Sequence, residues 1–243
     1  MHNILLKIIE KKKLELSQNK NNLLFKEKIL SAKNIGLIAE VKFASPTNPN
    51  LGSKEKLLDR VKKYEKGGAD AISIITEKYF FKGDVKSIEL VREQIKLPVL
   101  QKDFVIDKRQ IYQAKEVGSD ALLLIARLVD KKTLQSFVEL CFELDIEPVV
   151  EMNNEEDLKK TLATKTNIIA VNARNLENFK IDIDAACKLI KKIPNKYIKL
   201  GFSGINSKKE VIKYKNAGAR GVLVGTSLMK TENIKEFIER LKT

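Results

Sequence analysis

Short apolar runs alternate with longer amphipathic segments along most of the chain. Each run is five or six residues long, too short for a buried helix, and is mostly apolar on both faces. This pattern is typical of strands in a parallel sheet that is covered on both sides. There are eight such runs, at 36–41, 70–75, 97–101, 120–125, 147–151, 167–171, 197–201 and 220–225.

The segments between the runs have the spacing of helices. Apolar residues recur on one face at positions 134–144 and again at 234–241. Ser207 and Glu210 form a capping-box signature at the start of a further helix. Glycine also marks three similar joints at which a helix ends and a strand begins, because it accepts the backbone turn there. These joints contain Gly68, Gly118 and Gly218.

Eight strands that alternate with helices predict a (β/α)8 barrel, the TIM barrel, and 243 residues suit one such domain. An open doubly wound sheet is the alternative fold, but no G-x-G-x-x-G follows the first strand. We therefore expect residues 1–243 to form a single barrel domain. Residues 1–34 would be a helical extension, whose apolar face includes Leu5, Ile8 and Ile9.

Composition narrows the chemistry. The single histidine, His2, is at the N-terminus, which excludes a histidine-based triad and a histidine-rich metal site, so Lys, Glu, Asp or Tyr must carry acid–base chemistry. The two cysteines, Cys141 and Cys187, are not in metal-ligand spacing and favour a reducing cytoplasm. The N-terminal apolar run lacks a cleavage site, and no stretch of about 18 apolar residues is present, so we expect no signal peptide and no membrane partner.

The net charge of +14 raises the possibility of a nucleic-acid partner. The lysines are spread over helix faces, however, and no basic run is interleaved with aromatic residues. We therefore expect no nucleic acid, although the positive field would favour an anionic substrate.

Charged and polar side chains gather at the predicted C-terminal ends of the strands, where barrel enzymes have their active sites. Glu40 and Lys42 end the first strand, Lys102 the third and Glu151 the fifth. A single such group is more often part of a rim salt bridge, but six at the same ends of different strands indicate one site. The sixth-strand end completes the set, with Asn172 and Arg174.

Small residues follow the seventh and eighth strands. Ser203-Gly204 and Gly225-Thr226 allow the backbone to approach a ligand closely, and free N–H groups at such positions bind phosphate. Ordinary tight turns would have the same composition. Because both loops fit together, we predict a phosphate site.

These motifs together resemble the indole-3-glycerol-phosphate synthase family. The resemblance runs in order over essentially the whole chain, and the Glu-x-Lys and Lys-Asp-Phe motifs are its specific part. Its residues are Ile38–Lys42, Ala44–Pro46, Thr76–Gly83, Lys102–Phe104, Val150–Glu151, Asn172-x-Arg174, Ser203–Ile205 and Val224–Met229.

The resemblance implies a carboxy-lyase of tryptophan biosynthesis. Members of this family convert 1-(2-carboxyphenylamino)-1-deoxyribulose 5-phosphate to indole-3-glycerol phosphate, CO₂ and water, without cofactor or metal. By this resemblance Lys102 is the general acid at the ribulose carbonyl, and Lys42 holds the substrate carboxylate. Glu151 transfers a proton in the dehydration, Glu40 orients the lysines, and Asn172 positions the reacting groups.

The same resemblance assigns residues that bind the substrate. One group walls the aromatic ring and another contacts the sugar and the phosphate. The ring wall comprises Phe81, Phe104, Leu123 and Leu176, the further substrate contacts are Ser45, Arg174 and Ser203, and the phosphate loops contribute Gly204, Gly225 and Thr226.

The chain departs from the family pattern at a few places. Phe202 replaces a glutamate that lines the family's substrate pocket, which predicts a genuine but weakened synthase. Residues 45–49 replace the usual Ser-Pro-Ser-Lys-Gly, so the loop after the first strand should close differently. Asn175 replaces an aspartate and Ala170 a glycine.

Other interpretations are a family member with changed substrate or lost catalysis, and a related phosphate-binding barrel such as phosphoribosylanthranilate isomerase or the tryptophan synthase α subunit. Those barrels lack the pairing of Glu40-x-Lys42 with Lys102-Asp103-Phe104. We expect a small sugar-phosphate substrate and a chain that is monomeric or weakly dimeric.

Overall fold

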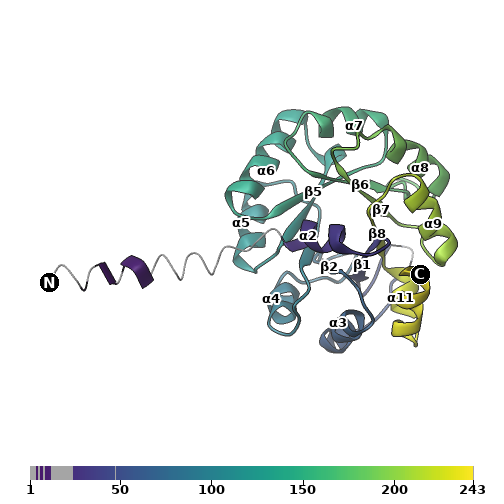
Figure 1. Cartoon of the computed structure of the whole chain (residues 1–243), viewed down its shortest axis with the longest axis horizontal. Helices are drawn as coiled ribbons and strands as arrows, with labels where there is room; N and C mark the ends of the chain where they lie inside the picture. Colours follow the sequence, from purple (N-terminus) through teal and green to yellow (C-terminus); the bar gives the residue numbers. More distant parts are fainter. Residues whose placement is uncertain (1–3, 5, 8, 12–23, 47, 243) are drawn as a thin grey trace.

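The computed structural model describes residues 4, 6–7, 9–11, 24–46 and 48–242. Among these residues, eight parallel strands pair in chain order and close into a barrel, with β1 also pairing β8 (Figure 1). The prediction of a (β/α)8 barrel is therefore confirmed. The strands are β1 (Gly36–Val41), β2 (Ala71–Ile75), β3 (Val99–Lys102), β4 (Ala121–Ile125), β5 (Glu147–Met152), β6 (Ile168–Asn172), β7 (Ile198–Phe202) and β8 (Gly221–Val224).

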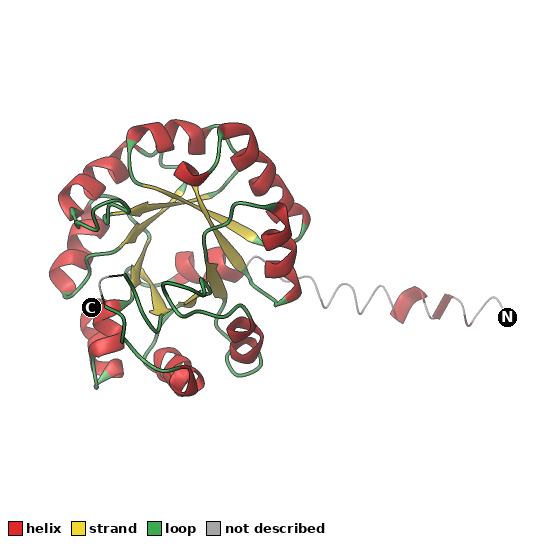
Figure 2. Ribbon diagram, turned by 180° about the vertical axis from the view of Figure 1, so that it is seen from behind, coloured by secondary structure: helices red, strands yellow, loops and turns green. Residues whose placement is uncertain are grey.

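Helices form the outer layer around these strands (Figure 2). Two short 3-10 turns, η1 (Lys54–Lys56) and η2 (Ala126–Leu128), follow β1 and β4. The helices are α2 (Leu24–Ser31), α3 (Leu57–Lys66), α4 (Lys86–Arg92), α5 (Lys108–Glu116), α6 (Lys131–Glu143), α7 (Glu155–Leu162), α8 (Ile183–Lys192), α9 (Lys208–Asn216), α10 (Thr226–Lys230) and α11 (Ile234–Lys242).

The local signals in the sequence have the expected structural outcome. The capping box of α9 forms, with the Ser207 side chain and the Glu210 side chain each satisfying a backbone N–H of the first turn. The three joint glycines have φ of +91°, +79° and +102°, a region that side chains disfavour. Glycine at these joints therefore lets each helix turn directly into the next strand.

Side chains alternate between the barrel axis and the helix layer, as they do along any strand. The residues that face the axis form a barrel-interior cluster, which contains Val149 of β5, whereas Val150 packs outward against α6. The same alternation places Glu147 and Glu151 on the axis side of β5, one at each end of the strand. The further members of the cluster are Phe25, Ile29, Ile38, Ala71, Leu100, Ala121, Leu123, Ile125, Ile168, Ala170, Ile198, Leu200, Phe202 and Leu223.

Helix α2 lies across the N-terminal end of the barrel (Figure 1). Its Phe25 and Ile29 side chains are buried and belong to the barrel-interior cluster. The backbone N–H of Lys26 donates to Glu147 Oε2 at 2.6 Å. This part of the predicted extension therefore packs against the barrel floor, whereas Leu5 and Ile8 lie outside the described residues.

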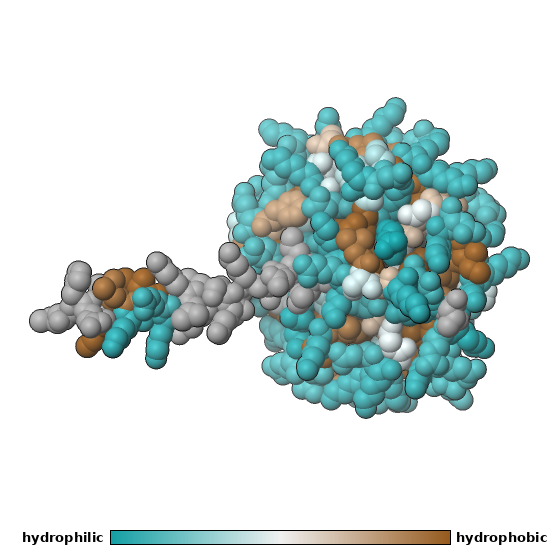
Figure 3. Space-filling model, in the orientation of Figure 1, coloured by the Kyte–Doolittle hydropathy of each residue, from teal (hydrophilic) through white to brown (hydrophobic). Residues whose placement is uncertain are grey.

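The outer surface is mostly hydrophilic on the face seen in Figure 3. The many lysines lie on exposed helix faces, as the sequence pattern indicated. No helix of the described part is long and apolar enough to span a membrane.

Candidate active site

A buried carboxylate lies between two lysines at the C-terminal end of the barrel. Glu40 on β1 is 1% exposed, and its Oε1 lies 2.8 Å from Lys42 Nζ. Its Oε2 accepts a hydrogen bond from Lys102 Nζ, on β3, at 3.0 Å. The predicted Glu-x-Lys and Lys-Asp-Phe motifs thus meet through one side chain.

The charges of this triad reinforce each other. Burial alone would raise the pKa of Glu40, but Lys102 and Lys42 lower it to about 2, so Glu40 is a carboxylate. Burial likewise opposes the charge of Lys102, but Glu40 and Glu151 outweigh it and raise the pKa of this lysine above its usual value. Lys102 is therefore an ammonium group that has a proton to donate, not a lysine with a depressed pKa.

A second carboxyl group, Glu151 on β5, is 3% exposed. Its Oε1 accepts a hydrogen bond from Asn172 Nδ2, on β6, at 3.1 Å, while its Oε2 is buried without a partner among the described residues. Burial raises the pKa of Glu151, although Lys102 and the Asn172 hydrogen bond oppose this. Glu151 therefore holds a proton more readily than an exposed glutamate, which suits a group that donates and accepts protons.

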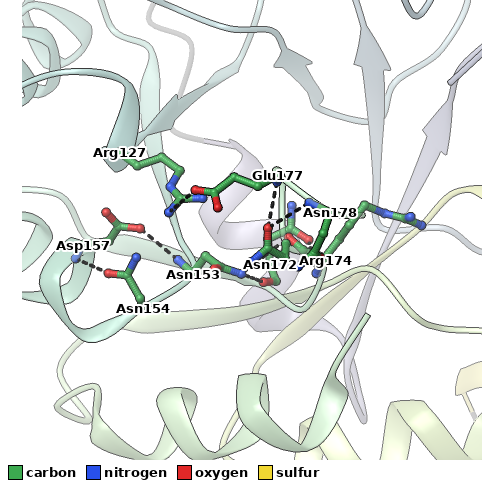
Figure 4. Close-up of polar contacts among 9 residues, drawn as sticks. Arg127, Asn153, Asn154, Asp157, Asn172, Arg174, Glu177 and Asn178 are labelled. Carbon is green, nitrogen blue, oxygen red and sulfur yellow. Dashed lines mark hydrogen bonds and ion pairs between the residues drawn. The ribbon is translucent and has the colours of Figure 1, made fainter. Parts of the chain in front are cut away.

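Asn172 also makes hydrogen bonds to its neighbours at the rim of the barrel (Figure 4). Its Oδ1 accepts the backbone N–H of Arg174 at 3.0 Å, and its backbone carbonyl accepts from Asn153 Nδ2 at 2.9 Å. Across the same rim, Arg127 Nη2 lies 3.6 Å from Glu177 Oε1 and so joins the loops after β4 and β6. Both ends of the Asn172 amide are thus engaged, and its clearest role in the structure is to orient Glu151.

The loops after β7 and β8 are tied to each other. Ser227 Oγ, in α10, donates to the carbonyl of Ile205 at 2.7 Å. Ser203 and Gly204 both adopt positive φ, +72° and +79°, which is strained for the serine. The predicted phosphate residues Gly204, Gly225 and Thr226 therefore belong to two neighbouring loops, although phosphate binding itself stays a prediction.

Gly225 lies directly against the buried carboxylate of Glu40. A Cβ atom at this position would overlap Glu40 Oε1 and would come within 3.1 Å of Lys42 Nζ. Glycine here lets β8 approach the Glu40–Lys42 pair without displacing it.

The predicted ring wall divides into two parts. Phe81 and Phe104, from the loops after β2 and β3, have ring centroids 6.2 Å apart and form one side of the mouth. Leu123, in contrast, is 1% exposed and is part of the barrel-interior cluster, against which the half-buried Leu176 packs. Leu123 thus belongs to the packed barrel interior, and its contact with the aromatic ring of a substrate stays a prediction.

Comparison with known proteins shows which family has this sequence. The family model for indole-3-glycerol phosphate synthase matches residues 5–241. The chain belongs to the indole-3-glycerol phosphate synthase family. An indole-3-glycerol phosphate synthase of Bacillus cereus is 37% identical over 250 residues, covering 100% of this chain and 99% of the relative. Another from Lachnoclostridium phytofermentans is 37% identical over 90% of this chain and 81% of the relative.

Solved structures support the fold independently. A crystal structure of 3-hexulose-6-phosphate synthase superposes with a TM-score of 0.68 at 14% identity, covering 86% of this chain and 98% of that one. At this identity the likeness concerns the barrel and not the chemistry.

The residue at which the sequence leaves the synthase family, Phe202, ends β7. Its side chain is fully buried in the barrel-interior cluster, so the ring points inward and not aside. Lys102 Nζ lies over the ring, 5.7 Å from its centroid. An apolar ring therefore stands beside the lysine where the family pattern has a carboxylate.

The loop after β1, the other departure from the synthase pattern, folds back on itself. Ser45 and Asn48 exchange two backbone hydrogen bonds, and Ser45 Oγ accepts the N–H of Asn48 at 3.1 Å. Ser45 is therefore part of a closed turn at the rim, half-buried.

Three residues that help to build the site are not evident as functional from the sequence. Tyr214 of α9 donates its hydroxyl to the carbonyls of Phe202 and Ser203, both at 3.0 Å. Its ring packs so closely on Gly201 that a Cβ there would overlap it. A glycine inside an apolar strand signals such a close approach, so Gly201 was the available clue. Asn153 carries no comparable signal, and the family resemblance of the segment Thr76–Gly83 gives Glu77 no role of its own.

Among the described residues, no group of three or more His, Cys, Asp or Glu side chains is arranged to hold a metal ion. Cys141 is buried, and burial raises the pKa of its thiol to about 12. Cys187 is half-buried and also unpaired.

Proposed function

We propose that this protein is an indole-3-glycerol-phosphate synthase. It would close the indole ring of 1-(2-carboxyphenylamino)-1-deoxyribulose 5-phosphate and release CO₂ and water. The observation that carries the proposal is the bridge from Lys42 through Glu40 to Lys102, at 2.8 and 3.0 Å, in a chain that matches the family over nearly its full length.

Ring closure places developing negative charge on the sugar carbonyl oxygen while the aromatic ring carbon attacks. Lys102 would donate its proton to that oxygen, because it is an ammonium at neutral pH and faces the mouth. Lys42 would bind the aromatic carboxylate until CO₂ leaves. A fixed cation at each end of the reacting system stabilises the transition state more than the substrate.

Loss of CO₂ restores the benzene ring, and loss of water then forms the double bond that completes the five-membered ring of the indole. Glu151 would transfer a proton in the loss of water, since its buried carboxyl has a raised pKa and one oxygen without a partner among the described residues. Asn172 would keep that carboxyl in place through its hydrogen bond to the other oxygen. Glu40 remains ionised and holds both lysines.

The substrate's phosphate would bind at the loops after β7 and β8, through Gly204, Gly225 and Thr226, with Ser203 and Arg174 nearby. The link between Ser227 and Ile205 supports this, because it holds the two loops together. Phe81, Phe104 and Leu176 would border the aromatic ring, and Ser45 would lie at the entrance.

The two unpaired cysteines support a reducing compartment such as the cytoplasm.

A second candidate is a family member with weakened activity or an altered aromatic substrate. Phe202 favours it, because the ring removes an acceptor beside Lys102 and fills the space instead. This candidate shares the reaction class of the first and differs in substrate preference.

A fluorescence assay for indole formation from the carboxyphenylamino sugar phosphate tests the proposal. We expect product from the parent protein and almost none from a Lys102→Ala control prepared alongside. If the parent forms no indole while the Bacillus cereus relative does so in the same assay, the first candidate is wrong. Analogues substituted on the aromatic ring then test the second.

A further inference from the structure

The loop between β2 and α4 is organised by one carboxylate. Glu77 Oε1 accepts the backbone N–H of Tyr79 at 2.8 Å. Its Oε2 accepts the N–H groups of Phe80 and Phe81 at 2.7 and 2.9 Å. Three successive amides thus converge on a single half-buried side chain.

The same loop is closed at its base and fastened to its neighbour. Gly83 N–H donates to the Glu77 carbonyl at 2.7 Å, and a Cβ on Gly83 would overlap the carbonyl of Ile75. Lys82, at a φ of +55°, reaches the loop after β1 and donates to the carbonyl of Pro49 at 3.0 Å.

Apolar burial does little to hold this loop. The side chains of Tyr79 and Phe80 are 83% and 69% exposed, so they gain little from the core. Only Phe81 is half-buried, and it contacts Phe104 at the mouth. The carboxylate of Glu77, and not packing, therefore sets the backbone path that aims Phe81.

We propose that Glu77 is a positioning residue for the reaction: by gathering the amides of Tyr79, Phe80 and Phe81, it holds the Phe81 ring against the aromatic part of the substrate. This inference rests on the proposed function, since that function supplies the aromatic ring. Glu77 touches no reacting atom and acts only through the loop.

The matched substitution is Glu77→Gln. It keeps the size of the side chain but replaces one acceptor oxygen with an N–H₂ donor that cannot accept from a backbone amide. The remaining bonds also lose their charge, which roughly halves their strength. Glu89→Gln is the control, because Glu89 is an exposed glutamate on the following helix α4.

Hydrogen exchange in the ligand-free protein gives the first measurement. Loss of charged hydrogen bonds should accelerate exchange of the amides of 79–81 by about tenfold, given typical values for such bonds. Exchange in β2 and α4 should not change. If the three amides exchange as they do in the parent, Glu77 does not organise the loop and the proposal fails.

Kinetics and binding give the second measurement. In Glu77→Gln we expect KM to rise about three- to tenfold with kcat within about twofold, because substrate positioning is lost while Lys102 and Glu151 remain. The dissociation constant of a non-reacting analogue, the substrate with its carbonyl reduced to an alcohol, should rise equally. Unchanged KM and binding, despite faster exchange, would leave Glu77 with a merely structural role and overturn the proposal.

A double-mutant cycle shows whether Glu77 acts through Phe81. On a Phe81→Ala background, Glu77→Gln should change KM by less than about twofold, because the ring it positions is already gone. Fully additive effects would contradict the proposal. If the parent neither binds the analogue nor forms indole, the proposed function is wrong; if it does both and Glu77→Gln matches it, only the inference about Glu77 is wrong.

Discussion

The ammonium group of Lys102 lies over the ring of Phe202, with Nζ 5.7 Å from the ring centroid. This contact is a cation–π interaction in a largely dry site, worth on the order of 1–2 kcal/mol. It offers the lysine no hydrogen-bond acceptor. Glu40 is consequently the carboxylate that the structure shows hydrogen-bonded to Lys102.

Phe202→Glu should raise kcat/KM on the carboxyphenylamino sugar phosphate. A carboxylate there would add an acceptor for the substrate, and one charged hydrogen bond is typically worth about ten- to a hundredfold. The parent should still be active, because Glu40, Lys42, Lys102 and Glu151 are all present. Steady-state kinetics of the two proteins check this.

The same substitution should lower the melting temperature, because it replaces a fully buried ring with a charged group inside the barrel-interior cluster. Phe202→Leu, which stays apolar, is the matched control and should not raise kcat/KM. If Phe202→Glu leaves catalysis unchanged, the residue does not limit the reaction and a changed substrate becomes the better interpretation.

Lys102→Ala should abolish nearly all turnover, by roughly 10²–10⁴-fold, the usual contribution of a positioned general acid. The side chain is 19% exposed and faces the mouth, so the fold should persist. Kinetics with circular dichroism as the folding control test this. Turnover within about tenfold of the parent would rule out Lys102 as the acid.

Gly225→Ala should impair catalysis through the Glu40–Lys42 pair. The new methyl group would overlap Glu40 Oε1, and a displacement of about 1 Å at a catalytic group commonly costs about 10²-fold in rate. Gly52→Ala is the control, because its Cβ would overlap the flexible end of Met229 and would otherwise make an ordinary contact with Phe43. Equal kcat/KM in the two variants would argue against the close approach.

Tyr214→Phe should weaken binding of the phosphate-bearing substrate. It removes only the hydroxyl that holds the carbonyls of Phe202 and Ser203, beside the strained Ser203-Gly204 turn. We expect KM to rise about three- to tenfold, in line with the loss of a hydrogen bond. Tyr112→Phe, at an exposed tyrosine of α5, should have no effect; a similar change in both would show that the turn is held by other contacts.

The free energy of unfolding should depend on pH through the titration of Glu147. Burial raises its pKa to about 7, although the Lys26 amide opposes this. A carboxyl whose pKa is higher in the folded than in the unfolded state stabilises the fold below the unfolded value, and that stabilisation is lost as pH rises from about 4.5 to 7. Glu147→Gln, which does not titrate but still accepts the Lys26 N–H, should therefore be more stable than the parent at pH 8.

Urea unfolding at pH 5.5 and pH 8 measures this difference. The gain in unfolding free energy of Glu147→Gln over the parent should be larger at pH 8, by on the order of 1–3 kcal/mol. Glu143→Gln, at an exposed residue of α6, is the control. A gain that is the same at both pH values would show that Glu147 does not titrate in this range.

The sequence was sufficient to predict the strands, since each apolar run coincides with a strand to within two residues. Buried parallel strands are continuous apolar runs, and the glycines and caps at their ends obey local rules. The lysines and glutamates of the site could also be predicted from the sequence, because the C-terminal ends of the strands in this fold share one face. Fold and family could therefore be inferred together.

Other parts depend on tertiary contacts that no local pattern encodes. Strand alternation accounts for the inward turn of Phe202, since Ile198 and Leu200 face the same way, but the sequence does not reveal that the ring lies beside Lys102. The grip of Glu77 on three amides depends on a loop path, and a glutamate after a strand predicts no such path. Lys102 illustrates the same limit, because the direction of its pKa shift is decided by the distance to Glu40.

The packing of α2 onto the N-terminal end of the barrel bears on how substrate reaches the site and how product leaves it. Among the described residues, Phe25 and Ile29 fill the N-terminal end, so the route to Glu40 and Lys102 lies between the loops that follow the strands. The substrate, indole-3-glycerol phosphate, CO₂ and water would all pass between these loops. If one of these loops moves slowly, it would limit kcat at the release of the bulky product and not at bond formation.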